Sequence, residues 1–183
     1  MSVPLLLVTG PVGVGKTTVT DEASDLLTAA GVAHACVDID ALTRSFPRPP
    51  DDRFNARLGL RNLAGIWRNY RDAGAGRLIV AAVVEDRAGI DGYRAAVPGA
   101  DVTVVRLRAP VAVLQRRLRR RMAGSGLGWH LARALELAHQ MDEAALEDHL
   151  VEAGQASAIE VARRVLVAAG WPQPAAPEGT TTA

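Results

Sequence analysis

Gly10-Pro11-Val12-Gly13-Val14-Gly15-Lys16-Thr17 decides the fold of this chain, because it matches the pattern G-x-x-x-x-G-K-[ST] at every fixed position. Lys16 is the only lysine in the sequence, and the positive charge elsewhere comes from arginine. A lysine kept in such a composition indicates a role that needs a compact ammonium group on a flexible stem. In this pattern, that role is to hold the β- and γ-phosphates of a nucleotide.

The neighbouring segments supply the context that the pattern requires. Residues 3–9 form a short apolar run typical of a buried parallel strand, and a helical pattern opens at Thr17. Between them, the glycines let backbone N–H groups turn toward phosphates, and the helix N-terminus adds the positive end of its dipole. We therefore expect nucleotide binding by Gly10, Pro11, Val12, Gly13, Val14, Gly15, Lys16, Thr17 and Thr18. The Thr17 hydroxyl is the expected Mg²⁺ ligand.

Length and composition suit one domain with a substantial core, since 49% of the 183 residues are hydrophobic. We predict a domain over residues 1–171 and a disordered tail over residues 172–183, which are rich in Pro, Ala and Thr. The formal net charge of +1 gives no field that would recruit nucleic acid or an anionic membrane. The apolar N-terminal run is too short to span a bilayer, and Cys36 has no second cysteine to pair with, so we expect a cytoplasmic protein.

Strand-like apolar runs alternate with helical patterns along the chain. After the first run, the predicted strands cover residues 33–39, 78–84, 102–107 and 149–151. The predicted helices cover residues 17–30, 54–73, 110–121 and 157–169, with one more after the Gly-rich break at residues 123–128. This alternation predicts a three-layer α/β/α fold around a parallel sheet, with ligands at the carboxyl ends of the strands.

Several classes of nucleotide-binding protein share the Gly10–Thr17 pattern. A Ras-like GTPase reads guanine through Asn-Lys-x-Asp, which this chain cannot contain because its one lysine is already used. Helicase, AAA+ and transporter ATPase domains usually run longer and carry an apolar strand that ends in Asp-Glu. These comparisons favour a small kinase that uses ATP before GTP.

Three further segments carry a resemblance to the P-loop small-molecule kinase superfamily. Residues 37–47 resemble the corresponding segment of chloramphenicol phosphotransferase-like and adenylylsulfate kinase-like proteins, and residues 52–57 resemble the latter. Residues 92–94, 102–107 and 114–118 are similar to the gluconate kinase pattern of strand, helix and arginine-bearing lid. The resemblance implies a five-stranded parallel sheet in the order 2-3-1-4-5 with a small helical lid.

Asp38 lies near the end of the second predicted strand, and Asp40 follows it directly. The resemblance implies that an aspartate here takes the proton from the acceptor hydroxyl, and a carboxylate at this strand end could reach the space beyond the γ-phosphate. On an extended chain the two side chains share a face, with Asp40 nearer the mouth. We expect Asp40 to be the base and Asp38 to be a substrate-side hydrogen-bonding or Mg²⁺-water partner. The alternative is a loop capped by Asp.

Two groups of arginines are candidates for binding charged groups. Arg117 and Arg121 are four apart on one helix, share a face, and are the expected lid residues that stabilise the transferring phosphoryl group. Arg44, Arg53 and Arg57 flank a Pro-rich loop where the similar kinases hold the acceptor, and they would suit an anionic substrate. The alternatives are a solvated helix face for the first group and local salt bridges for the second.

The combined hypothesis is an ATP- and Mg²⁺-dependent kinase. It phosphorylates a hydroxyl of a small metabolite or antibiotic-like compound, and the arginines favour an anionic one. The partners would be ATP and this acceptor, without nucleic acid or membrane, and the protein would be a monomer or homodimer. The rival hypothesis is a regulatory or chaperone-like module that hydrolyses ATP without an acceptor.

Overall fold

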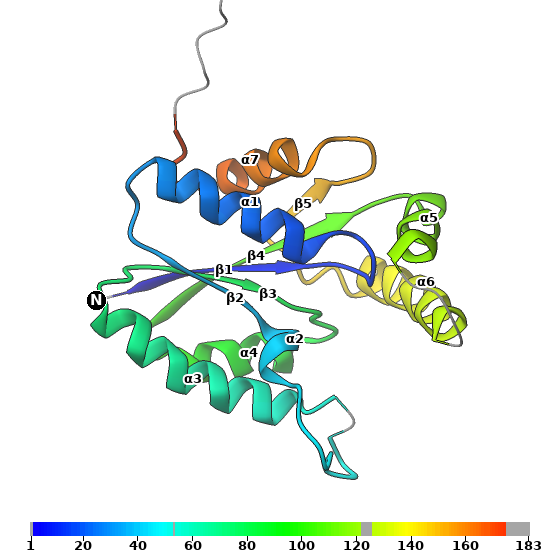
Figure 1. Cartoon of the computed structure of the whole chain (residues 1–183), viewed down its shortest axis with the longest axis horizontal. Coiled ribbons are helices and arrows are strands. Elements are labelled where there is room, and N and C mark those ends of the chain that lie inside the picture. The colour runs from blue at the N-terminus through cyan, green and yellow to red at the C-terminus, as the bar shows by residue number, and fades with distance from the viewer. Residues whose placement is uncertain (1, 53, 122–125, 175–183) are drawn as a thin grey trace, which may run out of the picture.

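The computed structural model describes residues 2–52, 54–121 and 126–174. Within these residues, five parallel strands form one sheet in the order β2-β3-β1-β4-β5 (Figure 1). The parallel sheet, its strand order and the helices on both faces confirm the predicted fold class. Residues 175–183, which make up most of the predicted tail, lie outside the described part of the chain.

The elements follow the predicted alternation. The strands are β1 (Val3–Thr9), β2 (Ala35–Asp38), β3 (Leu78–Ala81), β4 (Ala100–Arg108) and β5 (His149–Glu152). The helices are α1 (Lys16–Ala29), α2 (Ile39–Leu42), α3 (Ala56–Asp72), α4 (Arg87–Ala96), α5 (Val111–Arg121), α6 (Leu127–Ala144) and α7 (Ala158–Ala168). None of the helices in the described ranges combines the length and the apolar character that a bilayer crossing requires.

Two separate hydrophobic cores lie on the two faces of the sheet. β1 runs through the centre, and its alternating side chains supply both cores. Leu6 and Val8 pack with residues of α1 and α7 on one face, whereas Leu5 and Leu7 pack with residues of α3 and α4 on the other (Figure 1). β1 is therefore buried from both sides, which explains why its sequence is a continuous apolar run and not an alternating one.

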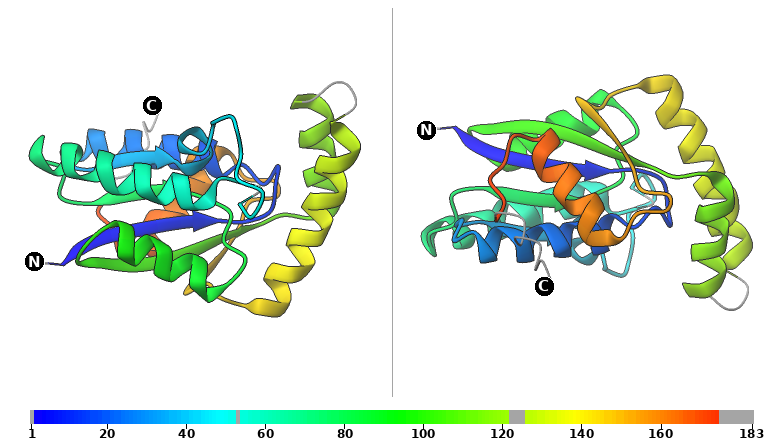
Figure 2. Two further views of the ribbon diagram at one scale, coloured as in Figure 1. Left: turned by 90° about the horizontal axis from the view of Figure 1, so that it is seen from below. Right: turned by 90° about the horizontal axis from the view of Figure 1, so that it is seen from above.

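Helices α5 and α6 form an antiparallel pair that stands across the carboxyl-terminal end of the sheet (Figure 2). This is the end at which the loops after β1, β2 and β4 meet. The pair occupies the place expected for the helical lid. Residues 122–125, which contain most of the Gly-rich connection between the two helices, are not among the described residues.

Two helices and two strand ends differ from the sequence-based prediction. The prediction that β2 continues through Ile39 is wrong, because the Asp38 carboxylate accepts a hydrogen bond from the Asp40 amide at 2.9 Å and starts α2. The third strand also ends early, since the Val84 amide donates to Thr9 Oγ1 at 3.1 Å instead of extending the ladder. The prediction also missed α4. The Asp86 side chain caps the N-terminus of this helix by accepting a hydrogen bond from the Gly89 amide at 2.8 Å.

A buried arginine fixes α6 to the sheet. The Arg106 side chain on β4 is 6% exposed and pairs with Asp142 of α6 at 2.7 Å and with Glu147 at 2.8 Å. Glu147 is itself only 12% exposed. Because water screens this cluster poorly, removing one charge would leave an opposite charge buried without compensation.

Arg106→Ala should therefore lower the free energy of unfolding by about 3–5 kcal/mol. The matched control is Arg108→Ala on the same strand, because Arg108 and its partner Glu152 are 48% and 55% exposed. An exposed pair of this kind contributes about 0–1 kcal/mol. Urea denaturation of both variants would measure the difference, and equal losses would contradict a specific role for the Arg106 cluster.

Candidate active site

The phosphate-binding loop has the backbone that its glycines predict. The φ values are 144° at Gly10, 85° at Gly13 and 104° at Gly15, which residues that have a Cβ rarely adopt. A Cβ on Gly10 would also lie 2.6 Å from the Leu107 carbonyl oxygen of β4. Helix α1 begins at Lys16 with no side chain capping its first turn. Its first N–H groups are therefore available to an anion.

Lys16 lies inside this loop. Its Nζ donates to the carbonyl oxygens of Gly10 at 2.9 Å and Pro11 at 3.3 Å. Burial lowers the pKa of Lys16 to about 8; the charges of Asp40 and Asp38 oppose this change, and Arg121 adds to it. The ammonium group is thus held in a site where burial disfavours its charge, and it would gain from the approach of an anion.

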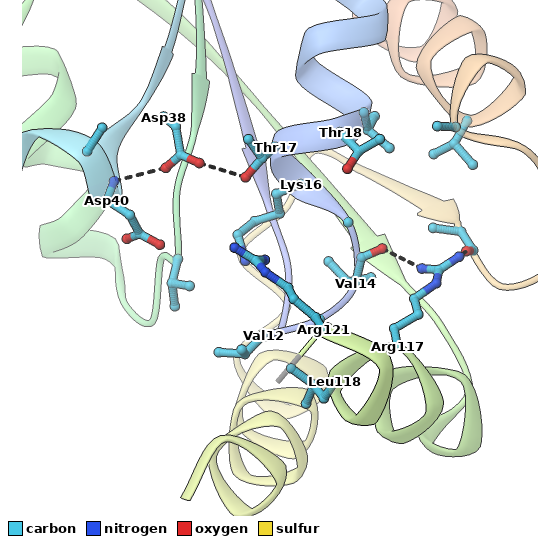
Figure 3. A pocket seen from close by; sticks show the side chains of 18 of the residues that line it. Val12, Val14, Lys16, Thr17, Thr18, Asp38, Asp40, Arg117, Leu118 and Arg121 are labelled. Atoms are coloured by element: carbon cyan, nitrogen blue, oxygen red, sulfur yellow. Dashed lines mark hydrogen bonds between the residues drawn. The ribbon is translucent and has the colours of Figure 1, made fainter. Parts of the chain in front are cut away.

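A short hydrogen-bond chain links the loop to the end of β2. Thr17 Oγ1 donates to Asp38 Oδ2 at 2.6 Å, and Asp38 Oδ1 accepts from the Asp40 amide (Figure 3). Because the Thr17 hydroxyl uses its hydrogen in this bond, its oxygen lone pairs stay available to a cation. Thr17 and Asp38 together therefore fit a Mg²⁺ ion that is also bound by nucleotide phosphates.

Asp40 lies on α2, and not on an extended continuation of the second strand. The argument that Asp38 and Asp40 share a strand face is therefore wrong, since a helix begins between them. Both carboxylates nevertheless line one cavity, with Asp40 on the side facing Lys16 (Figure 3). Asp38 is engaged by two hydrogen bonds, whereas no described side chain or amide binds the Asp40 carboxylate. Of the two, Asp40 is the one available to a ligand.

The two predicted lid arginines are in different environments. Arg117 donates through Nη1 to the Val14 carbonyl at 2.7 Å and through Nη2 to the Ala153 carbonyl at 2.9 Å. It therefore connects α5 to the phosphate-binding loop and to the loop after β5. Arg121 extends into the cavity toward Lys16 (Figure 3), and its charge contributes to the lowered pKa of Lys16. Of the pair, Arg121 is placed to meet phosphate oxygens.

The arginines predicted to bind the substrate, Arg44, Arg53 and Arg57, do not share one environment. Arg44 lines the cavity beside Asp40 and Ala41. Arg57 lies away from it, pairs with exposed Asp51 at 2.7 Å, and does not reach an acceptor in this arrangement. Arg53 lies outside the described residues. Of the two predicted arginines that the structure describes, Arg44 lies at the site and Arg57 does not.

The cavity that these residues line has a volume of about 460 Å³. At one end are small apolar residues of the β5–α7 segment, namely Ala153, Ala156, Ala158 and Val161. Toward the other end are Asp40, Ala41, Arg44 and Val83. The phosphate-binding loop lies between the two groups, so the cavity offers an apolar surface for a flat base, cations for phosphates, and a polar end for a second molecule. ATP with Mg²⁺ fits this set of residues.

An ion pair at the end of β3 was not predicted from the sequence. Arg133 of α6 donates to Glu85 and also pairs with Glu136 at 3.0 Å. Glu85 lies four residues after the end of β3, so the pair connects α6 to the segment that follows this strand. Nothing local in the sequence signals this contact, because its partners are separated by a whole strand and two helices.

Comparisons with known proteins support the kinase fold. Neither protein-family models nor curated protein sequences gave a match. Among solved structures, the gluconokinase from Sinorhizobium meliloti 1021 is 22% identical with a TM-score of 0.61, and the comparison covers 91% of both chains. The Mycobacterium tuberculosis APS kinase, solved with AMPPNP and APS, is 25% identical with a TM-score of 0.61, over 91% of this chain and 97% of that one. The Deinococcus radiodurans tunicamycin resistance protein is 22% identical with a TM-score of 0.63, over 93% and 98%.

The lowered pKa of Lys16 predicts two opposite pH dependences. ADP affinity should fall as the pH rises through about 8, because the neutral amine no longer attracts phosphate. The stability of the free protein relative to Lys16→Met should rise between about pH 8 and 10.5, because the unfolded chain there binds more protons than the folded one. Calorimetric titration with ADP and urea denaturation across this range would measure both.

Lys16→Met is also the control for the affinity measurement. It should bind ADP more weakly than the wild type at pH 7 and should lack the decline above pH 8. A decline of the same size in both proteins would show that another group causes it.

Proposed function

Because the chain has the fold of the P-loop small-molecule kinases, we propose that it transfers the γ-phosphoryl group of ATP to a hydroxyl of a small compound. The observation that carries this proposal is the position of Asp40. Its carboxylate faces Lys16 across a single cavity and has no partner among the described residues. A kinase needs a base at this place for the hydroxyl of its acceptor. A hydrolase would use the same carboxylate on water, so the response to an acceptor separates the two functions.

Lys16 and Arg121 have the electrostatic role in this proposal. Phosphoryl transfer spreads negative charge over the equatorial oxygens of the moving group, and fixed cations stabilise that charge. Lys16 lies where the phosphate-binding loop enters α1, and Arg121 comes from α5, so the two approach the phosphates from different elements (Figure 3). Arg117 instead holds the loop itself, through the Val14 carbonyl.

Thr17 and Asp38 would hold Mg²⁺. When bound, the ion supplies neutralisation of phosphate charge. Asp38 also holds the amide of Asp40, so the residue beside the metal site fixes the start of the helix that carries the base.

Asp40 would accept the proton of the acceptor hydroxyl. The hydroxyl oxygen forms a bond to the γ-phosphorus, the bond from that phosphorus to the β,γ-bridging oxygen breaks, and ADP leaves with the electron pair. Arg44 lies beside Asp40 and would bind an anionic group of the acceptor. We therefore favour an anionic metabolite or antibiotic-like compound. The proposal also includes a cytoplasmic enzyme that is a monomer or homodimer.

An acceptor panel tests the proposal directly. ADP formation from ATP and Mg²⁺ would be measured without an acceptor and with hydroxyl compounds that differ in charge. These would include anionic sugar acids, neutral nucleoside-like compounds and cationic aminoglycoside-like compounds. We expect at least one anionic compound to raise turnover well above the basal rate. A flat response across the panel would favour the ATPase module without an acceptor.

Asp40→Asn should separate transfer from nucleotide binding. It keeps the size of the side chain but removes its basicity, so acceptor-dependent turnover should fall by about 10²- to 10⁴-fold while ADP affinity holds. Asp38→Asn should weaken the Mg²⁺ dependence of ADP binding, because Asp38 contacts Thr17. If Asp40→Asn transferred phosphate at the wild-type rate, Asp40 would not be the base.

A further inference from the structure

The helix that carries Asp40 is too short to hold itself in place. α2 has four residues, Ile39–Leu42, and a single turn of helix is unstable in isolation. The carbonyl groups at its C-terminal end also lack partners within the helix. Contacts from outside α2 must therefore determine where Asp40 points.

Two asparagine side chains of the neighbouring α3 segment bind these carbonyls. Asn62 Nδ2 donates to the Leu42 carbonyl at 2.8 Å. Asn55 Nδ2 donates to the Thr43 carbonyl at 2.9 Å and more weakly to the Ser45 carbonyl at 3.4 Å. Together they bind carbonyl groups on both sides of Arg44, at the point where the chain leaves α2.

The backbone of α3 approaches this segment closely. A Cβ on Gly59 would lie 2.8 Å from Thr43 Cγ2, so the absence of a side chain there lets the two segments meet. Thr43 Oγ1 donates in turn to the Asp40 carbonyl at 3.0 Å. A continuous set of contacts thus runs from α3 through Thr43 to the backbone of Asp40.

We propose that Asn55 and Asn62 form a carbonyl clamp, which positions α2 so that Asp40 and Arg44 face the acceptor. This inference rests on the proposed kinase function and adds two positioning residues to it. The N-terminal end of α2 is held separately by Asp38, which binds Thr17 on the nucleotide side. The clamp fixes the other end, and Asp40 lies between the two.

Asn62 is the better residue to test, because the fold does not depend on it. Its side chain is exposed, whereas α3 packs on the sheet through the buried side chains of Leu63 and Trp67. Asn55 is 1% exposed and has a left-handed backbone with φ of 53°, so its replacement would also disturb the start of α3. Asn69 supplies a matched control: it lies two turns further along the same face of α3 and its side chain has no hydrogen bond to a described residue.

The experiment compares Asn62→Asp with Asn69→Asp. The two variants add the same charge to the same helix face, but only the first loses a donor to α2 and places a carboxylate against the Leu42 carbonyl. Asn62→Leu and Asn69→Leu repeat the comparison without added charge. The first readout is amide deuterium uptake by residues 39–46 with ADP bound, and the second is turnover with the best compound of the acceptor panel relative to ATP hydrolysis without it.

Both Asn62 variants should take up deuterium faster in residues 39–46 than either Asn69 variant. Their acceptor-dependent kcat/KM should fall at least about tenfold, since small displacements of a catalytic group have effects of this size. ADP affinity should match that of the Asn69 variants, because the nucleotide half of the site does not contact Asn62.

Equal deuterium uptake in all four variants would overturn the clamp. Unchanged acceptor-dependent kcat/KM in the Asn62 variants would overturn its positioning role. If instead no compound raises turnover of the wild-type protein, the proposed kinase function fails, and the exchange measurement still decides whether Asn62 holds α2.

Discussion

The Asp38 carboxylate is the interaction on which the site depends, because it joins two segments that the sheet keeps apart. One oxygen accepts from the Thr17 hydroxyl at 2.6 Å, and the other accepts from the Asp40 amide at 2.9 Å. β3 lies between the strands that deliver these residues, and Ala81 at its end pairs with Val8 on one side and Asp38 on the other. β3 ends there, so the Asp38 side chain can meet Thr17 beyond the sheet.

Local patterns predicted the conformation of the loop at residues 10–17 and the helix that follows it. The loop of Gly10 to Thr17 is set by glycine conformations and by the helix that follows, which are both properties of neighbouring residues. The alternation of apolar runs and helical patterns likewise predicted five parallel strands. The strand order itself came from the family resemblance, since periodicity does not say which strands are adjacent.

The environments of Asp40, Arg117 and Arg121 were harder to predict, since they depend on contacts between residues that are distant in sequence. Two aspartates two apart share a face only if the chain stays extended, yet hydrogen bonding by Asp38 turns the chain into α2. Arg117 and Arg121 lie on one helix face as spacing predicted, but carbonyls at Val14 and Ala153 engage the first and leave the second in the cavity. Spacing gives the direction of a side chain, and only the fold supplies its partner.

The lowered pKa of Lys16 has a chemical consequence that follows from the composition of the chain. Its Nζ is the only side-chain amine in the sequence, and with a pKa of about 8 it is neutral in about one-fifth of molecules at pH 7.4, against about one in a thousand for an ordinary lysine. The neutral amine is the nucleophilic form. An acylating reagent that enters the cavity would thus meet the one side-chain amine of the protein in a reactive form. A bound nucleotide would shield this amine from the reagent. The side chain that we propose to bind phosphate is therefore also an attachment point for a covalent probe of this site.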